Sequence, residues 1–144
     1  MNIGPATADD WQGILNLLDR ANLPIADLNG THLQHFLIAR DGAALAGAVA
    51  VQPFGSIGLL RSLVVDPAFR NEGVGKVLVH AAEALACDAG LSSLTLLTTT
   101  AASFFDRLGY ARIEHDEAPS DVQGSAEFAR LCPSTAVCMR KTLA

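Results

Sequence analysis

A buried strand that leads directly into a glycine-containing loop and a helix constrains the fold of this sequence more than any other feature. Ile57–Val65 is rich in apolar residues and predicts a strand, which Asp66-Pro67 ends because proline lacks the N–H group that a sheet requires. Apolar residues recur at helical spacing from Val74, and we expect this helix to end at Gly90. The succession of strand, loop and helix predicts an α/β or α+β fold.

Strands and helices alternate along the rest of the chain. Asp41-Gly42 supplies the positive φ angles of a tight hairpin turn. Pro24 and Asn29-Gly30 break up residues 22–34, which we expect to form a mobile flap. Further strands are predicted at residues 3–6, 36–40, 43–54, 91–98, 110–114 and 136–140, and helical segments at 7–21, 101–108 and 126–131. No repeat or linker divides these elements, so we predict one domain over residues 1–144.

The charge and hydropathy of the chain limit its partners. Ten Lys and Arg residues against fifteen Asp and Glu residues give a net charge of −5, and an acidic surface repels nucleic acids and anionic membranes. Half of the residues are hydrophobic, but no apolar run reaches the roughly 18 to 20 residues that cross a bilayer. We therefore expect a soluble, cytoplasmic protein with no nucleic-acid or membrane partner, and an anion site only where positive charge is locally concentrated.

The loop before the helix is such a place. Unpaired N–H groups and the positive end of the helix dipole, about +0.5 of a charge, meet at a helix N-terminus. Gly73 and Gly75 let the backbone approach a ligand closely, and Arg70 and Lys76 add positive charge. The loop is therefore a candidate site for a pyrophosphate.

Two well-known phosphate-binding motifs do not fit this loop. A P-loop would require glycine where Arg70 stands and serine or threonine where Val77 stands. A dinucleotide-binding fingerprint would require a small residue at Leu78 and an acidic residue near Leu96. Both motifs are excluded.

The loop instead resembles the signature of the GCN5-related N-acetyltransferases (GNAT family). The matching pattern is Arg-x-x-Gly-x-Gly from Arg70 to Gly75, preceded by Leu-Val-Val-Asp-Pro at residues 63–67, and Phe-Phe-Asp-Arg-Leu-Gly-Tyr at residues 104–110 resembles the second signature of the family. The resemblance implies a mixed, mostly antiparallel sheet flanked by helices, with a splayed central strand pair. It also implies an acyltransferase that moves an acetyl group from acetyl-coenzyme A to the amine of a small molecule, by direct attack, with no covalent enzyme intermediate and no metal. A homodimer would fit the same family.

Two further stretches are similar to a branch of this family that is linked to arsenic resistance. They are Leu-Thr-Thr-Thr-Ala at residues 97–101, and a tail that comprises residues 127–134 and 136–140. The similarity implies a detoxification setting, and we hypothesise an amino-acid-like acceptor with an anionic group.

The resemblance also assigns a coenzyme site on this sequence. It implies that the main chain of Leu63, Val64 and Val65 binds the pantetheine arm and the thioester, where a backbone N–H would stabilise an oxyanion, while the side chains belong to the core. The residues implied in phosphate binding are Arg70, Asn71, Gly73, Val74, Gly75 and Lys76.

The groups that would transfer protons are left open. An alkylammonium with a pKa near 10.4 is neutral in only about one molecule per few thousand at pH 7, so the acceptor needs a base or a lowered pKa. The glutamate that many family members carry on the strand is absent from residues 60–63, and Phe105 stands where the family often has a tyrosine acid. Tyr110, Ser62 and Glu114 remain as candidates. Three hypotheses stay open: an acetyltransferase, a non-catalytic acyl-coenzyme A sensor on the same fold, or an arsenite-binding protein that uses Cys87, Cys132 and Cys138, which ranks last because Cys87 lies in a different element.

Four residues are candidates for acceptor binding: Arg61, Ser62, Thr98 and Thr99. An arginine at the position of the family's base can bind an acceptor carboxylate, although an ordinary surface arginine is the alternative. Thr99 or Thr100 can equally cap the following helix. The three cysteines and four histidines show no metal-ligand spacing, and no metal site is predicted.

Overall fold

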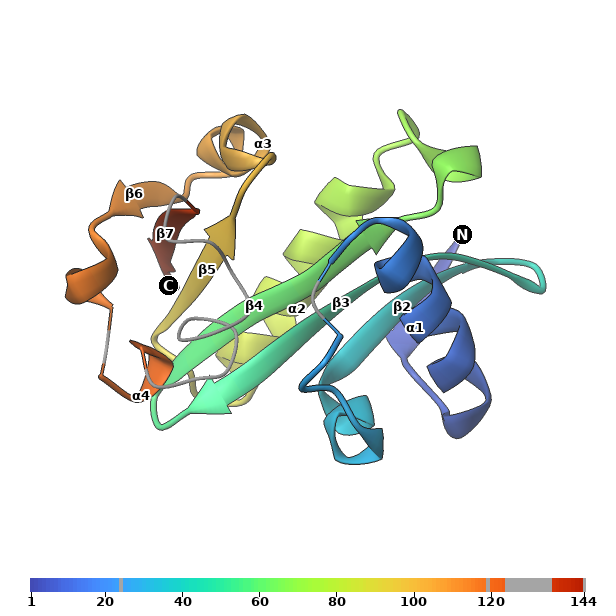
Figure 1. The fold of residues 1–144 in the computed structure, drawn as a ribbon, viewed down its shortest axis with the longest axis horizontal. Coiled ribbons are helices and arrows are strands. Elements are labelled where there is room, and N and C mark those ends of the chain that lie inside the picture. The colour runs from blue at the N-terminus through green and yellow to red at the C-terminus, as the bar shows by residue number, and fades with distance from the viewer. Residues whose placement is uncertain (24, 119, 124–135, 144) are drawn as a thin grey trace.

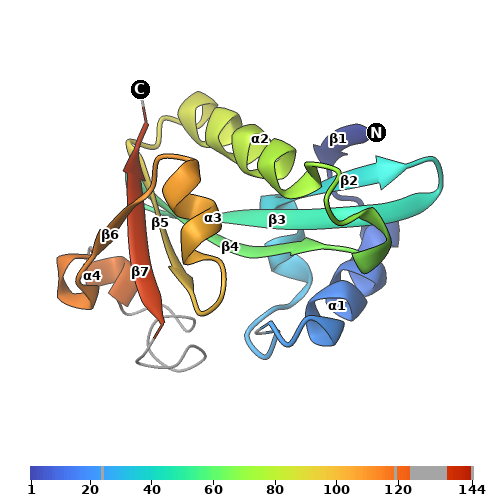
Figure 2. The same cartoon turned by 90° about the horizontal axis from the view of Figure 1, so that it is seen from above.

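The computed structural model describes residues 1–23, 25–118, 120–123 and 136–143, which form a seven-stranded sheet with helices on both faces (Figures 1 and 2). The strands are β1 (Asn2–Pro5), β2 (Phe36–Asp41), β3 (Ala44–Phe54), β4 (Ile57–Val65), β5 (Ser93–Thr98), β6 (Ala111–Ile113) and β7 (Val137–Thr142). The α-helices are α1 (Trp11–Arg20), α2 (Val74–Asp88), α3 (Ala102–Arg107) and α4 (Ser120–Gln123). Short 3-10 helices lie at η1 (Ala8–Asp10), η2 (Gly30–His35), η3 (Pro67–Phe69) and η4 (His115–Glu117).

The sheet is mixed and mostly antiparallel, as predicted. Its strand order is β1-β2-β3-β4-β5-β7-β6, and among these pairs only β4 and β5 run parallel within the described residues. The hairpin between β2 and β3 turns at Gly42, whose φ of +61° supplies the left-handed conformation that Asp41-Gly42 predicted.

Helices cover the two faces of the sheet in separate layers. The core under α2 contains Leu78 and Val79 with Leu94 and Leu96 of β5, whereas Ile14 and Leu18 of α1 pack on the opposite face. The segment around α4 packs on that second face too, where Val122 contacts the cluster that contains Leu59 (Figure 2). The apolar faces of α1 and α2 therefore pack on opposite faces of one sheet.

β4 and β5 pair over a short length and then separate, as the predicted splayed pair requires. Within the described residues their pairing is limited to Ile57 with Ser93, Gly58 with Leu94 and Leu59 with Thr95, beyond which the two strands diverge (Figure 1). A Cβ atom at Gly58 would lie only 2.7 Å from the Leu94 side chain, so glycine permits the close contact at the base of the opening.

A β-bulge lies in β4 where the opening widens. Ala48 of β3 pairs with Val64, but Ala50 pairs with Arg61, so β4 carries one extra residue here. Ser62 lies in the bulge with a φ of +59°, which is uncommon for a residue other than glycine. The bulge bends β4 at the residues to which the sequence assigned the thioester site.

Most differences from the predicted elements concern their ends, and one helix was not predicted. β5 begins at Ser93 rather than Leu91, because the Leu91 N–H donates to Ala86 at the end of α2. β7 continues to Thr142, which pairs with Ser93. α4 was not predicted, and the helical turn predicted at residues 126–131 falls outside the described residues. Among the described segments, none of the helices combines the length and the apolar character that crossing a membrane would take.

Candidate active site

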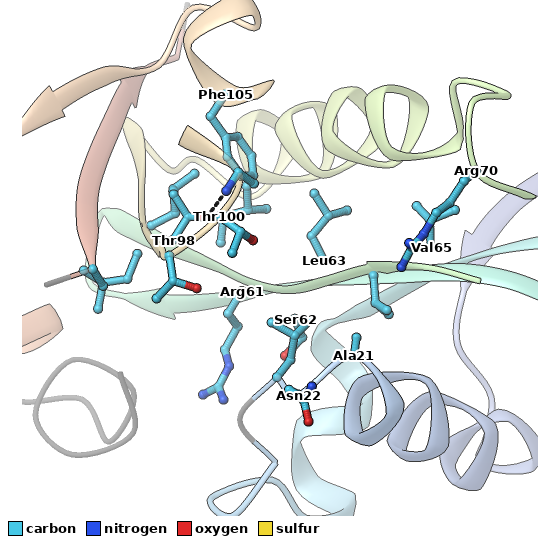
Figure 3. Close-up of a pocket in the computed structure, with 18 residues that line it drawn as sticks. Ala21, Asn22, Arg61, Ser62, Leu63, Val65, Arg70, Thr98, Thr100 and Phe105 are labelled. Atoms are coloured by element: carbon cyan, nitrogen blue, oxygen red, sulfur yellow. Dashed lines mark hydrogen bonds between the residues drawn. The ribbon is translucent and has the colours of Figure 1, made fainter. Parts of the chain in front are cut away.

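A cavity of about 580 Å³ lies in the opening between β4 and β5 (Figure 3). Its walls consist of Ala21, Asn22, Leu23, residues 60–65, Arg70, residues 96–101, Phe105 and Ala136. The cavity thus brings together the strand residues Leu63, Val64 and Val65, the acceptor candidates Arg61, Ser62, Thr98 and Thr99, and the first residue of the loop, Arg70.

The β4 wall presents main-chain groups to the cavity. In the described part of the chain, pairing with β5 stops at Leu59, so the edge of residues 60–65 on the β5 side has no strand partner. The side chains of Leu63 and Val65 pack with the α2 core, and that of Val64 packs with the α1 core. The packing of these side chains in the core matches what was predicted for them.

The loop at the start of α2 carries N–H groups that lack acceptors. Asn71 and Gly73 have left-handed φ angles of +66° and +76°, and the first helical bond runs from the Val77 N–H to the Gly73 carbonyl at 3.1 Å. Among the described residues, the N–H groups of residues 71–76 make no well-formed hydrogen bond to a protein acceptor, and Gly73 brings no capping side chain. A run of such donors at the positive end of a 15-residue helix favours an anion.

The side chains of the loop are also compatible with anion binding. Val74 is buried and anchors the loop, whereas Arg70, Lys76 and Glu72 are exposed. A Cβ atom at Gly75 would lie 3.4 Å from the Phe104 ring, so the helix start and α3 are in close contact. The donor set, which is main-chain N–H with two nearby cations, is chemically suited to a phosphate group.

Arg61 is held by a residue that the sequence analysis did not identify. Its two terminal nitrogens donate to the Asp27 carboxylate at 2.6 and 2.8 Å, and its side chain is only 2% exposed. Burial alone would raise the pKa of Asp27, but the hydrogen bonds and charge of Arg61, with a smaller contribution from His32, hold that pKa below its usual value. Arg61 is therefore a buried, ion-paired residue, not the outward surface arginine considered as the alternative.

The threonines at the end of β5 are in the cavity wall, as expected, but the helix cap is different. Thr98, Thr99 and Thr100 all line the cavity. The Ala101 N–H donates to the Thr98 hydroxyl at 2.9 Å in the turn that leads into α3. Ala101 is the N-cap residue, and α3 has no side-chain cap among the described residues, so the capping role considered for Thr99 or Thr100 is not observed.

Tyr110 lies outside the cavity, under α2. Its hydroxyl donates to Glu83 at 2.8 Å, and Lys141 donates to the same carboxylate at 3.1 Å and to the Leu108 carbonyl at 2.9 Å. Burial raises the pKa of Tyr110 above its usual value, and the Glu83 hydrogen bond and charge raise it further. A tyrosine with a raised pKa is a weaker acid, so these contacts connect α2 to β7 and do not favour proton transfer to a leaving thiolate.

Replacing Tyr110 with Phe is expected to affect stability more than catalysis. The change removes one hydrogen bond to a carboxylate and should lower the free energy of unfolding by about 1–2 kcal/mol. The rate of thiol release from acetyl-coenzyme A should change by less than about threefold. Urea denaturation and steady-state kinetics on the same preparation measure both quantities, and a fall in kcat of a hundredfold would identify Tyr110 as the acid after all.

The remaining candidates are placed away from the cavity. Glu114 is exposed and precedes η4, where its N–H donates to Glu117 at 2.8 Å. Cys138 is buried, and burial raises its thiol pKa to about 11, whereas Cys87 is exposed and Cys132 falls outside the described residues. No group of three metal-ligating side chains occurs in the parts of the chain that the structure describes.

The structure adds residues 21–23 and Asp27 to the site. All belong to the connection between α1 and η2, which the sequence predicted as a flap. The turn-forming residues around Pro24 indicated an irregular segment, but no local pattern indicated that it would contact β4.

Comparison with known proteins agrees with this geometry. The model of the acetyltransferase (GNAT) domain family matches residues 32–112. The uncharacterized N-acetyltransferase CT2212 of Chlorobaculum tepidum is 33% identical over 118 residues, which cover 78% of this chain and 73% of that protein. The amino-acid acetyltransferase of Escherichia coli K12 is 34% identical over 96 residues, which cover 65% of this chain but only 21% of that protein, so the similarity spans about a fifth of the larger enzyme.

A solved structure has the same fold as this chain. The fold matches Rv2747 from Mycobacterium tuberculosis, crystallised in complex with CoA, with a TM-score of 0.82 and 25% identity over the whole of both chains. The family model covers more than half of this chain, and the N-acetyltransferase from Chlorobaculum tepidum is similar over most of its own length. This chain therefore belongs to the GNAT family of acetyltransferases.

Proposed function

We propose that this protein transfers the acetyl group of acetyl-coenzyme A to the amine of a small, amino-acid-like molecule, acting as a single domain over residues 1–144. The amine attacks the thioester directly, with no covalent enzyme intermediate. The observation that carries the proposal is the cavity between β4 and β5, which has an unpaired strand edge along one wall and a run of acceptor-free N–H groups near one end. Acetyl-coenzyme A supplies an activated acyl group, and the chain supplies its binding and orientation.

The donor side fits acetyl-coenzyme A. The N–H groups of residues 71–76, with Arg70 and Lys76, provide the donors that a pyrophosphate needs. Leu63, Val64 and Val65 line the cavity along the β4 edge that has no strand partner in the described residues, where an amide-rich arm such as pantetheine can form strand-like hydrogen bonds. The crystallisation of Rv2747 with CoA supports this assignment.

The acceptor side is assigned to the wall that contains Arg61 and Ser62, together with Thr98 and Thr99. The similarity to amino-acid acetyltransferases and the guanidinium of Arg61 both support an acceptor with a carboxylate. Among the described lining residues none is a carboxylic acid, so we expect the acceptor ammonium to release its proton to water.

We also propose a biological role for the reaction. The arsenic-resistance branch rests on residues 97–101, which line the cavity, and on a tail that lies partly outside the described residues. We propose a detoxifying activity in the cytoplasm on this basis.

Two measurements test the proposal. Isothermal titration calorimetry should detect binding of acetyl-coenzyme A, and a thiol-release assay with the twenty L-amino acids should detect turnover that depends on the acceptor. Absence of binding heat would overturn the proposal. Binding without release by any amino acid or simple amine would favour the acyl-coenzyme A sensor instead.

A further inference from the structure

The guanidinium of Arg61 is already occupied by a carboxylate of the protein itself. Asp27 accepts one hydrogen bond from each terminal nitrogen, in the same bidentate geometry that a ligand carboxylate would adopt. Arg61 lines the cavity, yet its side chain is 2% exposed. A molecule in the cavity can therefore bind the guanidinium through both nitrogens only when Asp27 gives up its place.

Asp27 is the less buried of the two partners and lies outside the sheet. Arg61 is fixed within β4, where it pairs with Ala50 of β3. Asp27 lies in the connection between α1 and η2, which is held by turn hydrogen bonds such as that from the Leu28 N–H to the Ile25 carbonyl at 3.0 Å. Its side chain is 17% exposed, so water already reaches the carboxylate. The same connection supplies Asn22 to the cavity wall, on the side of β4 to which Arg61 projects (Figure 3).

We propose that Asp27 is a specificity-determining residue, which occupies Arg61 until an acceptor exchanges its own carboxylate for that of Asp27. This inference rests on the proposed function and names the feature of the acceptor that the site selects. The two carboxylates compete for one bidentate partner, and the acceptor gains the Arg61 bonds while the Asp27 carboxylate moves into water.

The exchange explains how a buried ion pair can select a substrate. Separating Arg61 from the Asp27 carboxylate without a replacement is unfavourable, because two charge-assisted hydrogen bonds at a buried site are lost. An acceptor with a carboxylate restores both hydrogen bonds, whereas a neutral analogue of the same shape leaves them unmade. We expect neutral analogues to be disfavoured by on the order of a hundredfold through this contact.

The first test compares the wild type with the isosteric Asp27→Asn variant. The acceptors are the L-amino acid that the wild type acetylates fastest and its α-carboxamide, which lacks the negative charge. The wild type should prefer the amino acid by about a hundredfold. In the variant, KM for the amino acid should fall about tenfold because its competitor is gone, with little change in kcat and no such fall for the carboxamide. An equal change of KM for both acceptors, or a rise for the amino acid, would overturn the exchange.

The second test uses the wild type and so does not depend on the folding of a variant. Hydrogen–deuterium exchange of the peptide that spans residues 21–28 is measured with coenzyme A and the N-acetylated amino acid, and again with the N-acetylated carboxamide. Faster exchange with the carboxylate product alone supports release of Asp27. Unchanged or slower exchange would contradict it. Failure of the wild type to acetylate any amino acid, by contrast, would remove the proposed amino-acid activity on which the inference rests.

Discussion

Replacement of Gly75 with Asp is expected to abolish acetyl-coenzyme A binding while the protein stays folded. Gly75 lies in the first turn of α2, and a Cβ atom there would meet the Phe104 ring at 3.4 Å and Val65 at 3.7 Å, which requires only a small adjustment. A carboxylate near a helix N-terminus also favours the helix. The same negative charge would face the pyrophosphate. Two unit charges about 4 Å apart repel by about 4 kcal/mol at an effective dielectric constant of about 20, which corresponds to about a thousandfold in affinity.

The neutral isostere provides the matched control. Gly75→Asn has the same shape as Gly75→Asp but no charge, so its Kd, measured by calorimetry, should rise far less. Thermal unfolding followed by circular dichroism should give a Tm for the Asp variant at or above that of the Asn variant. Equal Kd values for the two variants would mean that the loop does not face the phosphates, and the donor-site assignment would fail.

The donor side of the site could be predicted from the sequence because its signals are local. Pro67 ends a strand, Gly73 permits the left-handed turn before the helix, and Val74 begins an apolar helical pattern, all within a few residues of one another. The strand and the helix start were therefore placed correctly, and the acceptor-free N–H groups follow from the helix boundary itself. Local chemistry determines this half of the site.

The acceptor side depends on contacts between distant residues and could not be predicted in the same way. Asp27 and Arg61 are 34 residues apart. This pair has no local pattern, because it forms only when the connection between α1 and η2 packs on the sheet. The absence of a threonine cap on α3 follows from a shift of one residue at the helix boundary, which makes Ala101 the N-cap residue, and such ends are the least determined by sequence.

The backbone of Ser62 is a further feature without a sequence signal, and substitution there should have a large effect. Ser62 holds a φ of +59° in the bulge that bends β4 along the cavity. A β-branched side chain is a strong outlier at such a φ angle, so Ser62→Val should force β4 toward regular pairing and displace the main chain of Leu63. A displacement of about 1 Å in a reacting group lowers rates about a hundredfold, and we expect a loss of this size in kcat/KM.

The Ser62→Gly variant separates the conformation from the hydroxyl. Glycine adopts positive φ without strain, so this variant keeps the bulge and loses the hydroxyl group. If the bulge is what matters, kcat/KM of the Gly variant should stay within about tenfold of the wild type, while the Val variant loses about a hundredfold. If the hydroxyl transfers a proton or binds the acceptor tightly, the Gly variant should lose as much as the Val variant. Steady-state thiol-release kinetics with the best acceptor, together with Tm values to confirm folding, decide whether Ser62 acts through its side chain or through the shape it gives to β4.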